Sequence, residues 1–172
     1  MQAIAEADAP RSWPNAIVAH IDLSLGAEAC AKSIAAHKAA GANLRGIRDN
    51  LSWVPDKAIS LCAAKEEHMS RLPAFRAAFA LLASAGLSYD AWLYHEQLPD
   101  LTDLAAAFPG TTIICDHVGQ PLGKAPYEPA QVFPVWQERM RMLAQHKNVY
   151  VKLSGLGMAG VGLGFDQGAV PP

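Results

Sequence analysis

The sequence predicts an α/β fold built around a parallel sheet. Three observations predict it: short apolar runs rich in β-branched residues, longer stretches with apolar residues three or four apart, and Pro or Gly where the two kinds of stretch meet. Strands that alternate with helices favour parallel pairing and right-handed crossovers. We therefore expect about five βα units in a single domain that covers residues 1–172.

The first two expected strands lie in the first third of the chain. Residues 1–15 form a polar, alanine-rich lead-in whose structure the sequence does not predict. Residues 16–23 are an apolar run that contains an acid near its end, which indicates a strand. Residues 27–40 are rich in alanine and favour a helix, and Gly41 suits the position after its C-cap. Residues 44–48 indicate a second, shorter strand.

The rest of the chain alternates in the same way. Proline opens the helix expected at residues 73–85, glycine follows its end, and Phe75, Phe79 and Leu82 share one face. The remaining expected elements are a strand at 89–94, a helix at 99–108, a strand at 111–115, a helix at 132–143 and a strand at 148–153. Irregular structure is expected at 49–70 and 118–130, and the chain becomes glycine-rich from residue 155 onward.

Composition excludes several classes of partner. Apolar residues make up 51% of the chain, charged residues 17%, and the net charge is −2, so neither a polyanion nor nucleic acid is an expected partner. The three cysteines lie far apart without a C-x-x-C pair, which argues against a disulfide framework or a thiolate zinc site. We see no signal peptide and no apolar run long enough to span a membrane, so we expect a cytoplasmic protein.

The clearest candidate site residue is His117. It follows the buried strand at 111–115, and polar groups at the carboxyl end of a parallel strand face the crevice where ligands bind. His95 follows the preceding strand, and adjacent strands lie ~4.8 Å apart, so we expect the two imidazoles to meet. Asp116 alternates with His117 and is expected on the opposite face, as an anchor for other side chains.

Five segments carry a resemblance to a known family. They are Ala19–Leu23, Leu44–Arg48, Tyr89–Leu98, Phe108–Pro121 and Asn148–Leu156. In this order they resemble the amidohydrolase-related (amidohydrolase 2) family of TIM-barrel predicted metal-dependent hydrolases, which includes lactonases of the pyrone-dicarboxylate type. The resemblance implies a partial (β/α)8 barrel whose five strands correspond to the family's second to sixth. The family's His-x-His on the first strand and Asp on the last have no counterpart here.

The resemblance also implies roles for three side chains. His117 corresponds to a family histidine that binds a metal or contacts the substrate carbonyl, and His95 to a position in the catalytic pocket. Arg48 would hold a carboxylate or another polar group of the substrate, for which its planar fork is suited. Lys152 is a further candidate for substrate binding because of its position alone: it lies at the end of the last expected strand, and a desolvated lysine can stabilise an oxyanion.

Each of these roles has a structural alternative. The histidines would be part of a buried network or lie at the rim without a role, Arg48 would pair with Asp49 or Asp22 at the surface, and Lys152 would extend its ammonium into water. His20 and Asp22 share a strand face and could imitate a ligand pair, but a satisfied polar pair is the simpler expectation. Residues 155–160 match G-x-G-x-x-G without the helix that a dinucleotide site requires, so we expect a chance spacing.

The sequence therefore predicts a hydrolase that acts on a lactone, ester or amide bond of a small molecule. A zinc-like divalent metal is a candidate cofactor, but two candidate ligands are fewer than a catalytic zinc usually needs, so we expect weak or no metal binding. One alternative is a catalytically inactive fragment or remnant, and another is a flavodoxin-like open sheet. A partial barrel would also leave strand edges and helix faces exposed, which favours self-association.

Overall fold

The structure is a computed structural model that describes residues 3, 14–56, 64–158 and 160. In these residues five strands form one sheet in which every neighbouring pair is parallel. The strands are β1 (Ile17–His20), β2 (Leu44–Asn50), β3 (Ser88–Trp92), β4 (Ile113–Cys115) and β5 (Val149–Val151). Their spatial order is the order of the chain, which is the arrangement of a barrel segment. A flavodoxin-like sheet would place the second strand at the edge before the first, so that alternative is wrong.

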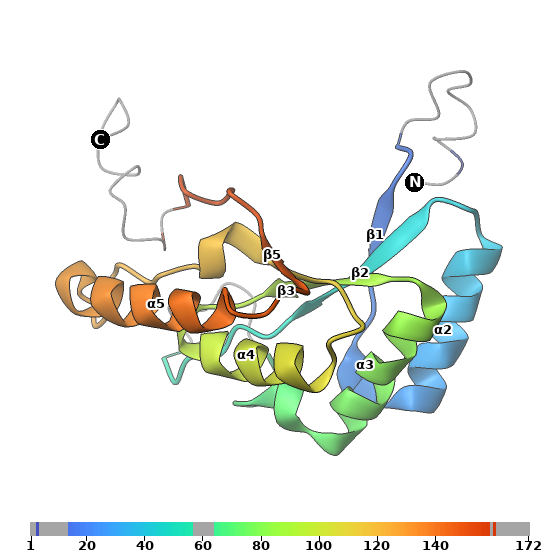
Figure 1. The fold of residues 1–172 in the computed structure, drawn as a ribbon, viewed down its shortest axis with the longest axis horizontal. Helices are drawn as coiled ribbons and strands as arrows, with labels where there is room; N and C mark the ends of the chain where they lie inside the picture. Colours follow the sequence, from blue (N-terminus) through green and yellow to red (C-terminus); the bar gives the residue numbers. More distant parts are fainter. Residues whose placement is uncertain (1–2, 4–13, 57–63, 159, 161–172) are drawn as a thin grey trace.

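The four helices described by the structure all lie on one side of the sheet (Figure 1). They are α2 (Ala27–Ala39), α3 (Pro73–Ala85), α4 (Leu98–Ala107) and α5 (Pro129–Leu143). Proline stands in the first turn of α3, α4 and α5, and Gly86 ends α3 in the left-handed conformation with φ 67°. α2 packs against α3, and α4 packs against α5. The expected helices and strands are confirmed with shifted ends. β2 extends past the expected end at residue 48, and α5 begins at Pro129, within the stretch that was expected to be irregular.

The core lies between the sheet and these helices. Ile47, Tyr89 and Ile113 occupy matching positions on β2, β3 and β4 and are fully buried. Phe79 of α3 packs its ring against Tyr89, with the ring centroids 5.0 Å apart. Each such side chain contributes on the order of 1.5–3 kcal/mol by burial, so this face provides most of the stability.

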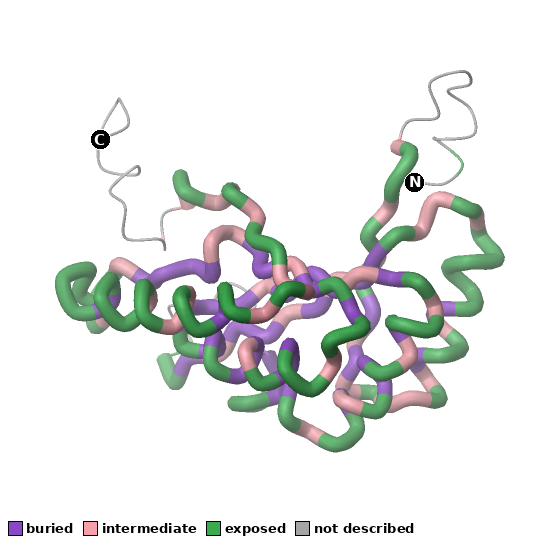
Figure 2. The backbone as a smooth tube through the Cα atoms, viewed as in Figure 1, coloured by how far each residue is buried: buried purple, intermediate pink, exposed green. Residues whose placement is uncertain are grey.

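The other face of the sheet is open in the described part of the chain. Val18 on β1 is 45% exposed and Tyr150 on β5 is 60% exposed, although both sit on strands. Figure 2 shows the buried backbone concentrated in the centre, with exposed segments toward both ends of the sheet. Between these ends, Arg48, Asp90 and Ile114 are in register on the open face. Polar side chains near the strand ends therefore face an uncovered surface.

Candidate functional site

A buried carboxylate links two cations across the open face. Asp116, which is fully buried, follows β4 and accepts a hydrogen bond from Arg48 Nε of β2 at 2.7 Å. Its other oxygen lies 3.0 Å from the ammonium of Lys152, which follows β5. Lys152 also donates to the buried Asp90 of β3. Four consecutive strands thus contribute to one ladder of alternating charge, and Asp116 serves as the anchor that the sequence predicted.

The two cations of this ladder remain charged and partly accessible. The side chains of Arg48 and Lys152 are 42% and 43% exposed, whereas their carboxylate partners are enclosed. Burial opposes the charge of Lys152, but hydrogen bonds to Asp90 and Asp116 outweigh burial and raise the pKa of the ammonium. Both Nε and Nη2 of Arg48 bond to Asp116, so the alternative pairing with Asp49 or Asp22 is wrong.

A cavity of about 440 Å³ opens beside the ladder. Its lining comes from the carboxyl ends of β1, β2 and β3 and from the segments after β4 and β5: His20, Arg48, Asp49, Asn50, Trp92, His117 and Met158. This volume lies within the range of roughly 300–1,000 Å³ that is typical of small-molecule sites. Arg48 and His117 therefore share one cavity, as the strand-end reasoning predicted.

His117 reaches the cavity through an unusual backbone conformation. β4 ends at Cys115, and His117 and Val118 have φ of 51° and 53°, in the left-handed region. Such residues cost on the order of 1–3 kcal/mol each and persist where surrounding contacts hold them. The strand alternation expected for Asp116 and His117 therefore does not apply, and the prediction that they face opposite sides is wrong. Arg48 contacts Asp116 and lines the cavity beside His117.

The imidazole of His117 is suited to work in its neutral form. Burial lowers the pKa of His117, while the nearby Asp116 carboxylate opposes this effect. Nδ1 lies 2.9 Å from the Ser154 hydroxyl. Among the described residues no hydrogen bond involves Nε2, so this nitrogen is available to a ligand in the cavity.

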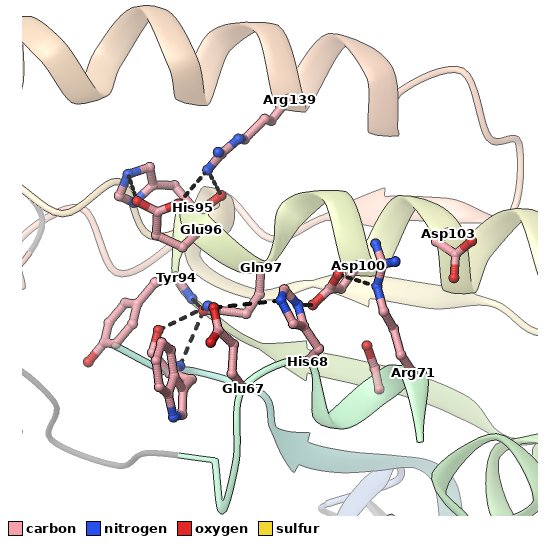
Figure 3. A network of polar contacts seen from close by, with 12 residues as sticks. Glu67, His68, Arg71, Tyr94, His95, Glu96, Gln97, Asp100, Asp103 and Arg139 are labelled. Carbon is pink, nitrogen blue, oxygen red and sulfur yellow. Dashed lines mark hydrogen bonds and ion pairs between the residues drawn. The ribbon is translucent and has the colours of Figure 1, made fainter. Parts of the chain in front are cut away.

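His95 does not join His117. β3 ends at Trp92, and the chain then turns into the short helix η3 (His95–Gln97), which carries His95 away from the strand end. The ring is 2% exposed, meets the ring of Tyr127 edge-on, and is not part of the cavity lining. Figure 3 shows Arg139 reaching from α5 to the His95 carbonyl and to Glu96. The expected convergence of the two imidazoles is therefore wrong, and Trp92 takes the place at the rim.

His20 and Asp22 also separate. β1 ends at His20, whose Nδ1 lies 3.0 Å from the Arg48 carbonyl oxygen at the edge of the cavity. Asp22 instead caps η1 (Leu23–Leu25) through the Ser24 amide, and it accepts a hydrogen bond from Lys65 at 2.5 Å. The two side chains therefore do not form a ligand pair.

The side chains present do not fit a tightly held metal ion. In the described part of the chain no group of three or more His, Cys, Asp or Glu side chains is arranged to hold one. The Asp116 carboxylate beside His117 is committed to Arg48 and Lys152, and the Asp49 carboxylate of the cavity accepts hydrogen bonds from the Leu23 and Asn50 amides. No described helix is long and apolar enough to cross a membrane.

Comparison with known proteins supplies the family context. A family model described as amidohydrolase matches residues 3–172. A curated relative, the uncharacterized protein y4mH of Sinorhizobium fredii, is 39% identical over 117 residues, which are 68% of this chain and 37% of the relative.

Solved structures agree with the family model. Two crystal structures of an amidohydrolase from Burkholderia multivorans, one with bound HEPES and one with bound Zn, match with a TM-score of 0.68 at 25% and 26% identity. The matches cover 90% of this chain and 49% of theirs. The chain therefore spans about half the length of these structural neighbours and less than half of the curated relative.

Proposed function

Because the chain belongs to the amidohydrolase family, we propose that its open sheet face binds a small lactone, ester or amide whose carbonyl is hydrolysed there. One observation carries this proposal: Arg48 and His117 line the same cavity, and Asp116 ties Lys152 to Arg48 beside it. Two cations and a neutral imidazole at the carboxyl ends of parallel strands suit a polarised carbonyl and the negative charge that develops on its oxygen.

The two cations would bind and polarise the substrate. Nε and Nη2 of Arg48 each donate one N–H to Asp116. Both N–H groups of Nη1 and the second N–H of Nη2 remain as donors for a substrate carboxylate or carbonyl oxygen. A bidentate grip on the substrate, suggested by the planar fork, would use Nη1 and the second N–H of Nη2. Asp116 fixes the position of Arg48 relative to Lys152, whose ammonium would stabilise the oxyanion of the tetrahedral intermediate.

His117 would handle the proton. Its lowered pKa keeps the imidazole neutral near pH 7, so Nε2 can accept a proton from a water that attacks the carbonyl carbon. The same proton can then pass to the leaving oxygen or nitrogen as its bond to carbon breaks. With the opposite tautomer, Nε2–H would donate to the carbonyl oxygen instead, and another group would activate the water.

Hydrolysis assays on a panel of lactones, esters and amides, including a pyrone dicarboxylate, test this function. We expect His117→Ala to lower kcat/KM by on the order of 10²–10⁴-fold, because general acid–base catalysis contributes about that much. His37→Ala is the matched control, since His37 is exposed on α2. Unchanged hydrolysis by His117→Ala would contradict the assignment.

Metal content is a separate prediction. Since the described residues offer no three-ligand group, we expect purified protein to hold clearly less than one zinc per chain. Elemental analysis of freshly purified protein checks this. Stoichiometric zinc that survives dialysis against a chelator would contradict it, and no step proposed for Arg48, Lys152 or His117 depends on the metal.

A second possibility follows from the coverage of the relatives. Because the chain spans 49% of its structural neighbours, its residues would form either an inactive remnant or a piece that works with a complementary segment. The same substrate panel separates these cases: activity of the chain alone supports the first proposal, and activity only after a complementary segment is added supports the second.

The buried free thiols of Cys30 and Cys115 support a reducing, cytoplasmic location.

A further inference from the structure

The segment after β5 contacts the imidazole of His117 in two ways. The Ser154 hydroxyl lies 2.9 Å from Nδ1. Gly155 presses its backbone against the same ring: a Cβ atom at this position would lie 2.7 Å from His117 Cβ, 2.8 Å from Cγ and 2.9 Å from Nδ1. Contacts below 3.0 Å are essentially never seen for real Cβ atoms, so a side chain at Gly155 would force the ring to move.

The backbone of this segment also holds the left-handed turn that carries His117. The Val118 amide donates to the Lys152 carbonyl at 3.1 Å, and the Lys152 amide donates to the Cys115 carbonyl at 3.0 Å. Gly155 itself has φ of 70°, a conformation that glycine adopts without a steric cost. Residues 152–155 thus support both the backbone and the ring of His117.

These contacts restrict what the ring can do. With Nδ1 bonded to Ser154 and the ring packed on Gly155, the imidazole is left with Nε2 for a ligand. The hydroxyl can accept from a protonated Nδ1 or donate to an unprotonated one, so this contact holds the ring in either tautomer. Which of these holds decides whether Nε2 accepts a proton or donates one.

We propose that Ser154 and Gly155 are positioning residues that fix the ring orientation of His117 and hold its Nδ1 at the Ser154 hydroxyl. This inference rests on the proposed function of His117, although its first readout does not require activity. Residue 155 is also the first glycine of the G-x-G-x-x-G match. Its close approach to the imidazole of His117 explains why a glycine stands there without a nucleotide site.

The experiment compares Ser154→Ala, Ser154→Thr and Gly155→Ala by NMR of the imidazole nitrogens at fixed pH, with His117→Gln used to assign the signals. We expect Ser154→Ala to move the His117 nitrogen signals because Nδ1 loses its hydroxyl partner, and Gly155→Ala to move them because the added Cβ displaces the ring. Ser154→Thr should leave the signals in place because it keeps the hydroxyl. Gly157→Ala is the matched glycine control, since nothing lies within 4 Å of a Cβ at that position. Ser84→Ala is the matched hydroxyl control on the surface of α3.

Kinetics provide the second readout. On the best substrate of the panel, Ser154→Ala should lower kcat on the order of 10- to 100-fold with little change in KM, because a misplaced catalytic group costs rate and leaves ground-state binding intact. The proposal would be overturned if the His117 nitrogen signals of Ser154→Ala matched those of the unmodified protein. If Gly155→Ala does not fold, the result for Ser154→Ala alone decides. If the signals move while hydrolysis persists in His117→Ala, the positioning stands and the proposed function fails.

Discussion

The two faces of the sheet have the same backbone and opposite roles. On the covered face, Ile47, Tyr89 and Ile113 are fully buried beneath the helices, and their contacts are apolar. On the open face, Arg48 and Lys152 are partly exposed and are held by buried carboxylates, and Arg48 also lines the cavity. Alternate residues of the same strands therefore serve stability and binding. A substitution on the open face can change the site without removing the core contacts of the covered face.

The largest expected effect is on stability at the covered face. Phe79→Ala should lower the free energy of unfolding by about 3–5 kcal/mol, because it removes a fully buried ring that packs on Tyr89 and Phe108. Val18→Ala on the open face should cost well under about 1 kcal/mol, since Val18 is already 45% exposed. Urea unfolding followed by circular dichroism measures both, and similar losses in the two variants would remove the distinction between the faces.

An intermediate effect is expected from the buried His95. Burial lowers the pKa of His95 to about 4, below the value of about 6.5 in an unfolded chain. Between these values the unfolded chain binds more protons, so the contribution of His95 to stability is present above pH 6.5 and is lost as the pH falls toward 4. The slope from this group is at most about 1.4 kcal/mol per pH unit.

Unfolding free energies at several pH values between these limits check the His95 prediction. His95→Gln should show a shallower fall in stability toward low pH than the unmodified chain. His37→Gln, which changes an exposed histidine of α2, should keep the original slope. A His95→Gln slope equal to that of the unmodified chain would show that His95 is not held neutral.

The smallest effect on stability is expected at the free edge of β5, where we propose that two copies of the chain associate. Tyr150 and Leu153 are 60% and 84% exposed there, and β5 has no further strand beside it in the described residues. Leu153→Lys should change stability by no more than about 0.5 kcal/mol but shift the protein toward monomers. Light scattering after size exclusion measures this.

A matched control exists for the association prediction. Leu25 is 62% exposed in η1, away from β5, so Leu25→Lys should leave the oligomeric state unchanged. An unmodified chain that is monomeric at all concentrations, or an equal effect of both lysine variants, would contradict association through the β5 edge.

Much of the fold could be predicted because its signals are local. The starts of α3 and α4 were marked by Pro73 and Pro99, and strands by short β-branched runs, so element order and type followed from the sequence. Pro129 was expected in an irregular stretch, although it begins α5. Arg48, Lys152 and His117 were identified because each lies at or just past a strand end. Trp92 was missed, although it lies two residues after Asp90 on the same strand, and period-two reasoning could have found it.

The rest of the site depends on contacts that sequence spacing does not encode. The pairing of Lys152 with Asp90 joins residues 62 positions apart and requires the register of three strands. His95 was misplaced because β3 ends at Trp92, two residues earlier than the apolar run suggested. The turn at His117 is left-handed without a glycine at that position, so its local sequence gives no warning that strand alternation ends at Cys115.

The most direct test of the open face as a ligand site is an NMR titration with a pyrone dicarboxylate that follows the side-chain signals of Trp92, His117, Trp53 and His95. We predict that the Trp92 and His117 signals move together, that Trp53 and His95 stay in place, and that Lys152→Met weakens the response. Movement of the His95 and Trp53 signals with Trp92 and His117 unchanged would contradict the assignment of the site to the open face.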